Sequence, residues 1–431
     1  MTQNSTASKT RVRLQWAILG LLFLSTVINY VDRQALSVLL PSLRRDLGLS
    51  SEDYGNITGL FQAVYAVAGV AMGAWVDRVG VRMGLGLAVL VWSAAAMMHA
   101  LARGPWSLGA LRVLLGIGEG ANWPAGGKAV MRWLPPERRA LGMGVFDGGS
   151  AIGAIIAPPL VVAIATAWGW PQAFIATGLM GLVWLALWLL IYDDPSRHRW
   201  LSAEERAAAE SARGVEAPAE GFWVAARRLL AIRALWGLAL TRFIATPVWW
   251  FYVLWLPDYL DRGRGFSLAE IGMYAWIPFL TADIGKVAGG WISDRWLAGG
   301  ASATLARKAV MAAGACFMAA GLLVVEAATA PAAIAWVCAA TFGFGMWSAN
   351  ILALHADAFQ SRLLGRAIGL TGMAASAGGA VFTLMVGRIV DQAGYGAAFA
   401  AAGALPVAAC AALFLAVGRV RPAEREGDVS T

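Results

Sequence analysis

Long apolar segments recur along the whole chain, and each is interrupted by few charged residues. A helix needs roughly 20 consecutive, mostly apolar residues to cross the hydrocarbon core of a membrane. The pattern predicts twelve such helices, over residues 16–40, 55–76, 83–102, 107–131, 141–166, 172–192, 234–259, 270–292, 308–328, 331–354, 365–388 and 395–418. We therefore expect an all-α membrane protein with twelve transmembrane helices.

One long polar connection, residues 193–233, separates the sixth predicted helix from the seventh. Within it, Ser202 and Glu205 have the spacing of a capping box, which predicts a short surface helix inside the linker. The predicted organisation is a six-helix bundle over 1–192, a cytoplasmic linker over 193–233, and a second bundle over 234–431 that ends in a short tail.

The two halves of the chain repeat each other. "GAWVDR" at 73–78 and "GWISDR" at 290–295 share Gly, Asp and Arg at an offset of 217 residues, and the same offset relates Ser50 to Ser267. Duplication of a six-helix unit predicts two pseudo-symmetric bundles. This is the architecture of transporters whose substrate binds near the bilayer midplane.

The composition supports a lipid environment. The chain is 59% apolar and 14% charged, whereas soluble domains are about 45–50% apolar and about 25% charged. The first apolar segment is too long for a signal peptide and is followed by no small-residue cleavage site, so we expect it to remain as a helix. The three cysteines lack paired spacing or a nearby histidine, and we expect no metal and no cofactor.

The basic residues predict an orientation. With the N-terminus in the cytoplasm, 23 Lys and Arg residues fall on the cytoplasmic side and 6 on the other side, which is the bias of a membrane protein with both termini inside. Because the net charge of +8 is dispersed over short loops, it does not indicate a nucleic-acid partner.

Several charged residues interrupt the predicted helices. Such a group costs roughly 2.5–3.5 kcal/mol at the centre of a membrane helix, so it lines a cavity or pairs with another charge. We expect Lys128 to reach the membrane surface, Asp283 and Lys286 to form a local ion pair, and Arg242 to serve in a gate, in a site or as an interface anchor.

The first and fourth predicted helices carry the strongest candidates. Arg112 and Glu119 lie two turns apart on one helix face, and Asn122 continues that face. Asp32 lies about 100° around the helix from Arg33, so both can border one cavity. Arginine suits a bound carboxylate, and a carboxylate in a dry site can take up a proton. The combination predicts coupling of an organic anion to protons; alternatively, the four charges only hold the two helices together.

Further polar and aromatic residues could wall a sugar-acid pocket. The same residue types also serve in helix packing and in bonds to their own backbone, so both roles stay open. We expect His355 and Asp357, at the end of the tenth predicted helix, to be solvated. The pocket candidates are Tyr30, Trp249, Trp250, Tyr252, Trp347, Asn350, Thr371 and Ser376.

The repeated loop motif is a candidate gating element. Asp77 can face a helix N-terminus or a nearby arginine and so lock one conformation. With Arg78 and their counterparts Asp294 and Arg295, it is predicted to act in gating rather than in substrate binding.

These motifs resemble a known family. "GAWVDRVGVR" is similar to the signature loop of the major facilitator superfamily, and "GWISDR" to its second copy. "INYVDRQALS", "RVLLGIGEGANWPAGGKAV" and "RFIATPVWWFYVLWLPDYL" resemble the anion:cation symporter family. That family includes bacterial hexuronate, galactonate and glucarate transporters as well as sialin and the vesicular glutamate transporters.

The resemblance implies proton-coupled uptake of a sugar-acid anion by alternating access. It places Asp32 and Glu119 at proton-coupling positions, and Arg33 and Arg112 near the anion, with Arg112 also engaging Glu119. It places Tyr65 and Ser150 in the pocket. Asp147 departs from the asparagine expected at its position.

The predicted function is a proton-coupled symporter for a hexuronate, aldonate or glucarate in a bacterial inner membrane. The expected partners are the anion, protons and lipid, and the expected state is a monomer. An exchanger or uniporter for another organic anion is the alternative. A receptor of the same fold would need a larger soluble domain, and an intramembrane enzyme would need a nucleophile or metal motif that this chain lacks.

Overall fold

The computed structural model describes residues 9–213, 227–359 and 361–418, and within these ranges the chain is helical without a strand. The middle of the predicted linker, residues 214–226, and the predicted tail from residue 419 lie outside the described residues. The all-α fold predicted from the hydropathy pattern is confirmed.

Nine of the described helices are long and apolar enough to cross a membrane. Short 3₁₀ turns, His99–Leu101 and Ala320–Leu323, extend two of them. The nine are α1 (Lys9–Val38), α3 (Ser51–Val79), α4 (Val81–Met98), α7 (Pro136–Trp168), α8 (Trp170–Ile191), α11 (Arg233–Arg264), α14 (Ala303–Ala319), α15 (Ala330–Ala358) and α16 (Ser361–Ala416).

The predicted helix over 107–131 is broken into α5 (Pro105–Glu119) and α6 (Asn122–Trp133). Pro124 has no N–H to donate to the carbonyl of Gly120, so the regular hydrogen-bond ladder cannot pass this point. Neither piece alone has the length of a membrane span, although together they cover the predicted segment.

Two other predicted segments differ in their bounds. The predicted helix over 270–292 consists of α12 (Leu268–Tyr274) and α13 (Ile277–Ala298), and α13 carries Asp283, Lys286 and Asp294. The predicted helices over 365–388 and 395–418 both fall in α16, where Gly394 has non-helical dihedrals (φ 75°, ψ −177°). Only glycine adopts that backbone conformation readily, so α16 is two helices that meet at a kink. All twelve predicted segments are therefore helical.

Capping boxes mark corresponding points of the two sequence halves. Ser50 and Asp53 bond reciprocally before α3, and Ser267 and Glu270 do so before α12, again at an offset of 217 residues. Ser202 and Glu205 form the predicted box before the short surface helix α9 (Ala203–Arg213). A further short helix, α2 (Leu40–Leu47), follows α1 directly.

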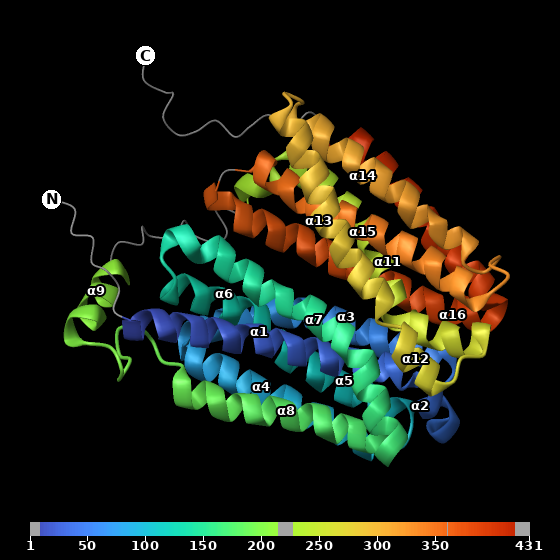
Figure 1. Cartoon of the computed structure of the whole chain (residues 1–431), viewed down its shortest axis with the longest axis horizontal. Helices are drawn as coiled ribbons and strands as arrows, with labels where there is room; N and C mark the ends of the chain where they lie inside the picture. Colours follow the sequence, from blue (N-terminus) through green and yellow to red (C-terminus); the bar gives the residue numbers. More distant parts are fainter. Residues whose placement is uncertain (1–8, 214–226, 360, 419–431) are drawn as a thin grey trace. The chain divides into compact units, whose positions relative to one another are not determined.

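The described residues form two compact units. The first, called unit 1, runs up to Leu36 and from Val64 to Arg213. In it, α4 lies beside α8 and α5, and α7 packs on α6 and α8 (Figure 1). Gly149 and Gly153 bring α7 close to α1: a Cβ added at these positions would lie 2.3 Å from the Phe23 carbonyl oxygen and 2.6 Å from that of Val27. Such small residues one turn apart let membrane helices approach closely.

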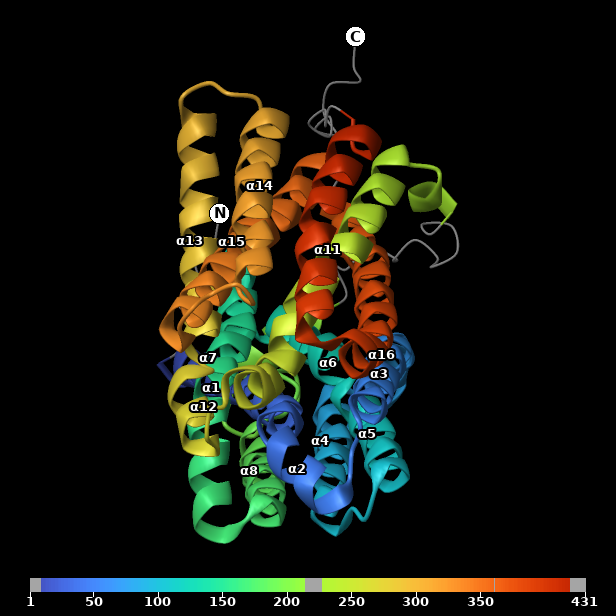
Figure 2. The ribbon, with the colours of Figure 1, turned by 90° about the vertical axis from the view of Figure 1, so that its right-hand side faces the viewer.

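The second, called unit 2, contains residues from Ser37 to Ala63 and from Arg227 onward. Its most extensive contact joins α11 to α16, and α13, α14 and α15 pack together as a second layer (Figure 2). Gly378 brings α16 against α11, because a Cβ there would lie 2.0 Å from the Phe243 carbonyl oxygen. The predicted domain boundaries near residues 192 and 234 stay a prediction.

Candidate functional site

The centre of unit 1 holds a buried ion pair between α1 and α5. Arg33 donates from Nη2 to Glu119 Oε2 at 2.7 Å and from Nε to the same oxygen at 3.2 Å. Arg33 is 3% exposed and Glu119 is 0% exposed. Asn29, one turn before Arg33 on α1, accepts a further hydrogen bond from Nη2. Glu119 is therefore hydrogen-bonded to Arg33, and the further engagement of Glu119 by Arg112 that the resemblance implies stays a prediction.

Two more buried charges lie beside this pair. Asp32 and Arg112 are each 2% exposed, and Arg112 lies within electrostatic reach of both Asp32 and Glu119. Both Asp32 oxygens are buried and, within the described part of the chain, make no hydrogen bond of normal geometry; Thr177 is the polar group beside them. Glu119 Oε1 is likewise buried and makes no hydrogen bond of normal geometry with a described residue. The two arginines and two carboxylates are called the charge quartet below.

Aromatic rings cover the Arg33 guanidinium. The ring of Tyr65 lies 4.5 Å from the guanidinium carbon and the ring of Tyr30 lies 5.2 Å from it. Tyr30 in turn lies near Ser150 and Asp147 of α7. Asp147 is exposed and Ser150 is 8% exposed. The structure thus brings these predicted pocket residues to one place in unit 1, where Arg33 is held between an acid and two rings.

Asn122 begins α6, directly after the break that follows α5. It is fully buried and bonds to α1, accepting from Ser25 Oγ at 3.0 Å and donating to Thr26 Oγ1 at 3.2 Å. The break in the helix is what turns this side chain toward α1. Asn122 therefore holds α6 against α1, with both ends of its amide occupied.

The aromatic candidates of unit 2 are placed mainly in packing positions. Tyr252 and Trp347 are 1% and 2% exposed, and Tyr252 packs against the rings of Phe251 and Phe399. Trp249 stacks on Phe344 with ring centroids 5.2 Å apart. Trp249 and Trp250 are both half-buried. Of the four, the two tryptophans of α11 keep exposed surface.

The polar candidates of unit 2 also have protein partners. The Asn350 amide donates to the Gly289 and Met346 carbonyls, and Ser376 is half-buried on α16. Thr371 bonds to Arg242 at 3.0 Å and to His355 at 2.8 Å. His355 is 0% exposed, so the expectation that it is solvated was wrong: the end of α15 packs on α16 and covers the ring.

The signature loop of unit 1 forms an ion pair at the end of α3. Lys128 of α6 bonds to Asp77 at 2.6 Å and to the Gly73 carbonyl at 2.8 Å. The partner of Asp77 is thus this lysine rather than an arginine. Because Asp77 is 68% exposed, the pair is a surface contact, and the expectation that Lys128 reaches the membrane surface stays a prediction. Arg78 is exposed.

The second copy of the motif is built similarly in unit 2. Asp294 accepts from Arg307 of α14 at 2.7 Å, and Arg307 also lies 3.5 Å from Asp357 at the end of α15. Arg295 lies over the ring of Trp291. Each copy therefore uses its aspartate to bind a cation from a neighbouring helix, and the predicted local pair between Asp283 and Lys286 is present at 2.8 Å.

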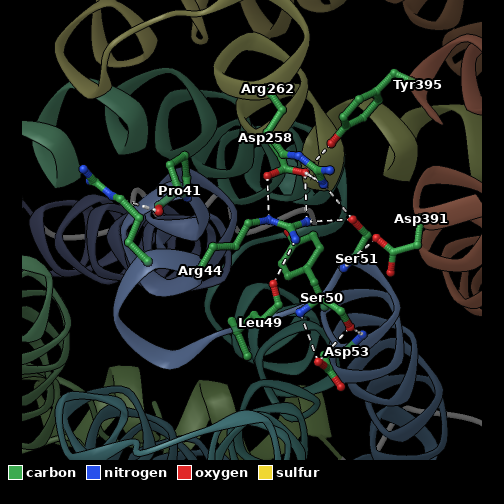
Figure 3. Close-up of polar contacts among 12 residues, drawn as sticks. Pro41, Arg44, Leu49, Ser50, Ser51, Asp53, Asp258, Arg262, Asp391 and Tyr395 are labelled. Atoms are coloured by element: carbon green, nitrogen blue, oxygen red, sulfur yellow. Dashed lines mark hydrogen bonds and ion pairs between the residues drawn. The ribbon is translucent and has the colours of Figure 1, made fainter.

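Sequence reasoning missed one polar cluster, in unit 2 (Figure 3). Asp258 of α11 is 0% exposed, and its two oxygens accept from Arg44 Nε at 2.9 Å and Nη2 at 3.0 Å. Tyr395 also donates to Asp258, and Arg262 lies 4.0 Å away. The available signal was Asp258 itself, a charge next to Pro257 inside an apolar run.

The fold and the buried charges define a membrane transporter. The chain belongs to the Major Facilitator Superfamily, whose family profile matches residues 22–383. Its fold agrees with that of a solved D-xylose-proton symporter, with a TM-score of 0.73 and 16% identity over 94% of this chain and 98% of the other. It is a multi-pass membrane protein and a transporter rather than an enzyme.

Curated relatives narrow the class. The chain is 33% identical over 394 residues to the hexuronate transporter of Escherichia coli (strain K12), covering 90% of each chain. It is 35% identical over 280 residues to the galacturonate transporter of Dickeya chrysanthemi, covering 65% of this chain and 81% of the relative. The resemblance to sugar-acid transporters is confirmed, and the bacterial relatives agree with the predicted inner-membrane location.

Proposed function

We propose that the protein imports a sugar-acid anion together with protons by alternating access. The first candidate substrate is a hexuronate. The observation that carries the proposal is the charge quartet in unit 1, in which two arginines and two carboxylates lie buried within reach of one another. The names of the curated relatives support a sugar acid as the substrate.

The charge balance of the quartet supports the coupling. With all four side chains ionised, Arg33 and Arg112 carry +2, and Asp32 and Glu119 carry −2. An added substrate carboxylate would leave one negative charge uncompensated in a region of low polarity, which is costly. Uptake of one proton by a carboxylate of the quartet restores neutrality. Anion and proton therefore bind together more favourably than either binds alone.

The contacts of Arg33 suggest which carboxylate takes the proton. Glu119 occupies the Nε and Nη2 donors of Arg33, and these are donors that a substrate carboxylate would need for a bidentate contact. Protonation of Glu119 weakens its hold on the guanidinium and makes Arg33 available to the substrate. Without substrate, Glu119 and Arg33 neutralise each other. With substrate bound, the proton neutralises Glu119 and the anion neutralises Arg33.

The other predicted site residues have roles consistent with this proposal. Tyr30 and Tyr65 hold the guanidinium in one plane while it changes partner, since aromatic faces attract cations. Ser150 offers a hydroxyl to the sugar within unit 1. The half-buried Trp249 and Trp250 of unit 2 stay pocket predictions. Asp147 adds a negative charge near Tyr30, so its ionisation opposes an anion, and an asparagine there should raise anion affinity.

Reconstituted proteoliposomes test the function. We expect galacturonate or glucuronate added outside to cause an inward proton movement, detected by a pH-sensitive dye inside the vesicles, and an imposed inward proton gradient to drive accumulation. Galactonate, glucarate and gluconate serve as competitors that rank the substrate class. Uptake without any proton movement would favour the uniporter or exchanger instead. A ligand that binds raises the melting temperature of the purified protein, so a melting temperature raised by none of these acids would refute the substrate class.

A further inference from the structure

Asp147 of α7 is an acid of unit 1 that does not belong to the charge quartet. It lies inside the apolar span of that helix, Glu137–Trp168, yet its side chain is exposed. An ionisable residue within a membrane helix faces the interior of the bundle or a water-filled cavity rather than lipid. The Asp147 carboxylate therefore borders water on an inner face of α7.

The neighbours of Asp147 place it beside the proposed anion site. Ser150, three residues further along α7, lies on the same side of the helix, and both side chains lie near Tyr30 of α1. The two helices approach closely here, because a Cβ added at Gly153 would lie 2.8 Å from Tyr30 Cβ. The Tyr30 ring in turn lies 5.2 Å from the guanidinium carbon of Arg33. Tyr30 therefore connects the cation that would hold a substrate carboxylate with the acid of α7.

The protein leaves room beside the Asp147 carboxylate. Gly144 lies one turn before Asp147 and Gly148 directly follows it. A Cβ added at either glycine would meet no heavy atom within 4 Å from any described residue beyond the adjoining backbone of α7. Atoms of a bound molecule can therefore occupy the space next to this carboxylate.

An ionised carboxylate distinguishes hydroxyl groups from other carboxylates. It only accepts hydrogen bonds, at about four lone-pair positions, and a hydroxyl group that donates to it forms a charge-assisted bond. A second carboxylate has no proton to donate, and its charge is repelled at contact distance. Asp147 therefore favours a hydroxyl group in the adjoining space and opposes a charged group there.

We propose that Asp147 determines which sugar acids the site takes: Arg33 holds the carboxylate, and Asp147 accepts hydrogen bonds from hydroxyl groups at the far end of the sugar. Hexuronates and aldonates fit this arrangement, because each carries a single carboxylate. Aldarates, such as galactarate and glucarate, carry a carboxylate at both ends and are excluded by repulsion. The proposal rests on the proposed function, which it narrows to monocarboxylates.

This role of Asp147 leaves the charge balance of the quartet unchanged. Asp147 is exposed, so water and dissolved ions screen its charge, whereas the members of the quartet are buried. A monocarboxylate therefore still brings one negative charge to the quartet and still requires one proton. The exclusion of dianions keeps the charge of the substrate matched to the single proton that the quartet takes up.

The test compares galactarate with two monocarboxylates by equilibrium binding to purified full-length protein. Galactonate differs from galactarate only in a CH₂OH group in place of the second carboxylate, and galacturonate differs in the oxidation state of C1. We expect the wild type to bind the tighter of the two monocarboxylates about ten-fold or more tightly than galactarate, since contact between like charges is costly. In Asp147→Asn this preference should shrink about ten-fold, because asparagine accepts from hydroxyl groups without a charge.

Two companion variants separate the charge of Asp147 from its hydrogen bonds. Leucine accepts no hydrogen bond, so Asp147→Leu should bind the monocarboxylates several-fold more weakly than Asp147→Asn does. Asp46 is an exposed acid of α2 and belongs to unit 2. Asp46→Asn removes an equal charge outside unit 1 and should keep the wild-type preference.

Ligand-free melting temperature serves as the control for folding. If Asp147→Asn does not fold, Asp147→Ser replaces it, because serine also lacks the charge and keeps an acceptor. A wild type that binds galactarate as tightly as the monocarboxylates, or a preference that persists in every uncharged variant that folds, would overturn the inference and leave the proposed function intact. Absence of binding of both monocarboxylates and of glucuronate by the wild type would instead count against the proposed function.

Discussion

Two arginine–carboxylate pairs of this protein each contain a fully buried acid but are completed differently. In unit 2, both oxygens of Asp258 are bonded, by Arg44 and Tyr395, and Arg262 lies beside them. In unit 1, Glu119 uses one oxygen for Arg33, and its other oxygen and both oxygens of Asp32 make no hydrogen bond of normal geometry with a described residue.

The difference in hydrogen bonding separates a pair that stabilises the fold from the pair to which the proposed function assigns proton coupling. A buried charge whose hydrogen bonds are all satisfied has no reason to change its state, so the Asp258 cluster holds α2, α3, α11 and α16 of unit 2 in one arrangement. A buried carboxylate with unsatisfied oxygens is poorly stabilised in its charged form and gains from a proton or a new partner. The unsatisfied oxygens of the quartet are what the proposed coupling of proton and anion requires.

The largest expected effect comes from Glu119→Gln. Because glutamine cannot exchange a proton, gradient-driven uptake should fall to the background of empty vesicles, while counterflow of labelled galacturonate without a gradient should persist in part. Uptake of labelled galacturonate measures gradient-driven transport when a proton gradient is imposed and counterflow when none is imposed. Glu204→Gln, an exposed position on α9, is the matched control. Normal accumulation by Glu119→Gln under a proton gradient would contradict the role of this residue.

Asp258→Leu should mainly affect stability. Removing one member of a buried ion pair leaves the other charge uncompensated and costs roughly 3–5 kcal/mol, whereas replacing both members by apolar residues is often nearly neutral. We expect thermal unfolding in detergent to show this loss for Asp258→Leu and a recovery in the double variant Arg44→Met/Asp258→Leu. Equal losses in both variants would mean that the two side chains act independently.

Tyr65→Leu should have an intermediate effect on substrate affinity. A cation–π contact contributes about 0.5–2 kcal/mol, so loss of the ring over Arg33 should raise the Kd for galacturonate about 2- to 30-fold. Tyr65→Phe keeps the ring and should bind almost as the wild type does in the same titration. If phenylalanine were as damaging as leucine, the hydroxyl rather than the ring would be what the site uses.

Asp77→Asn should have the smallest effect on stability. Asp77 is 68% exposed, and an exposed ion pair contributes less than about 1 kcal/mol and is screened by salt. We expect the melting temperature to shift by a degree or two at low salt and hardly at all at high salt. A loss as large as that of Asp258→Leu would show that the pair with Lys128 is not a surface contact.

Much of the fold could be predicted because a segment that crosses a membrane must be a long, mostly apolar helix. Every predicted apolar segment is helical, and the capping boxes before α3, α9 and α12 lie where serine and acidic residues are spaced by three. The breaks were harder to predict. The separation of α5 from α6 depends on which carbonyl loses its partner at Pro124, and the kink at Gly394 depends on a backbone angle.

The charged centre was predictable for a related reason, since ionisable residues are conspicuous in apolar helices. Spacing alone could not say which acid each arginine would meet, and the pairing of Glu119 with Arg33 emerges only from the packing of α5 on α1. Asp258 was missed because its partner Arg44 lies 214 residues away. His355 was expected in water because helix ends usually are, but here α16 covers the ring.

The most direct test of the central claim is the pH dependence of galacturonate affinity, measured in the wild type and in Glu119→Gln. If the substrate and ionised Glu119 compete for Arg33, wild-type affinity weakens as the pH rises and Glu119 loses its proton, and Glu119→Gln binds with little change over the same range. A Glu119→Gln variant whose affinity still weakens with rising pH as the wild type's does would contradict the claim that Glu119 couples the proton to the anion.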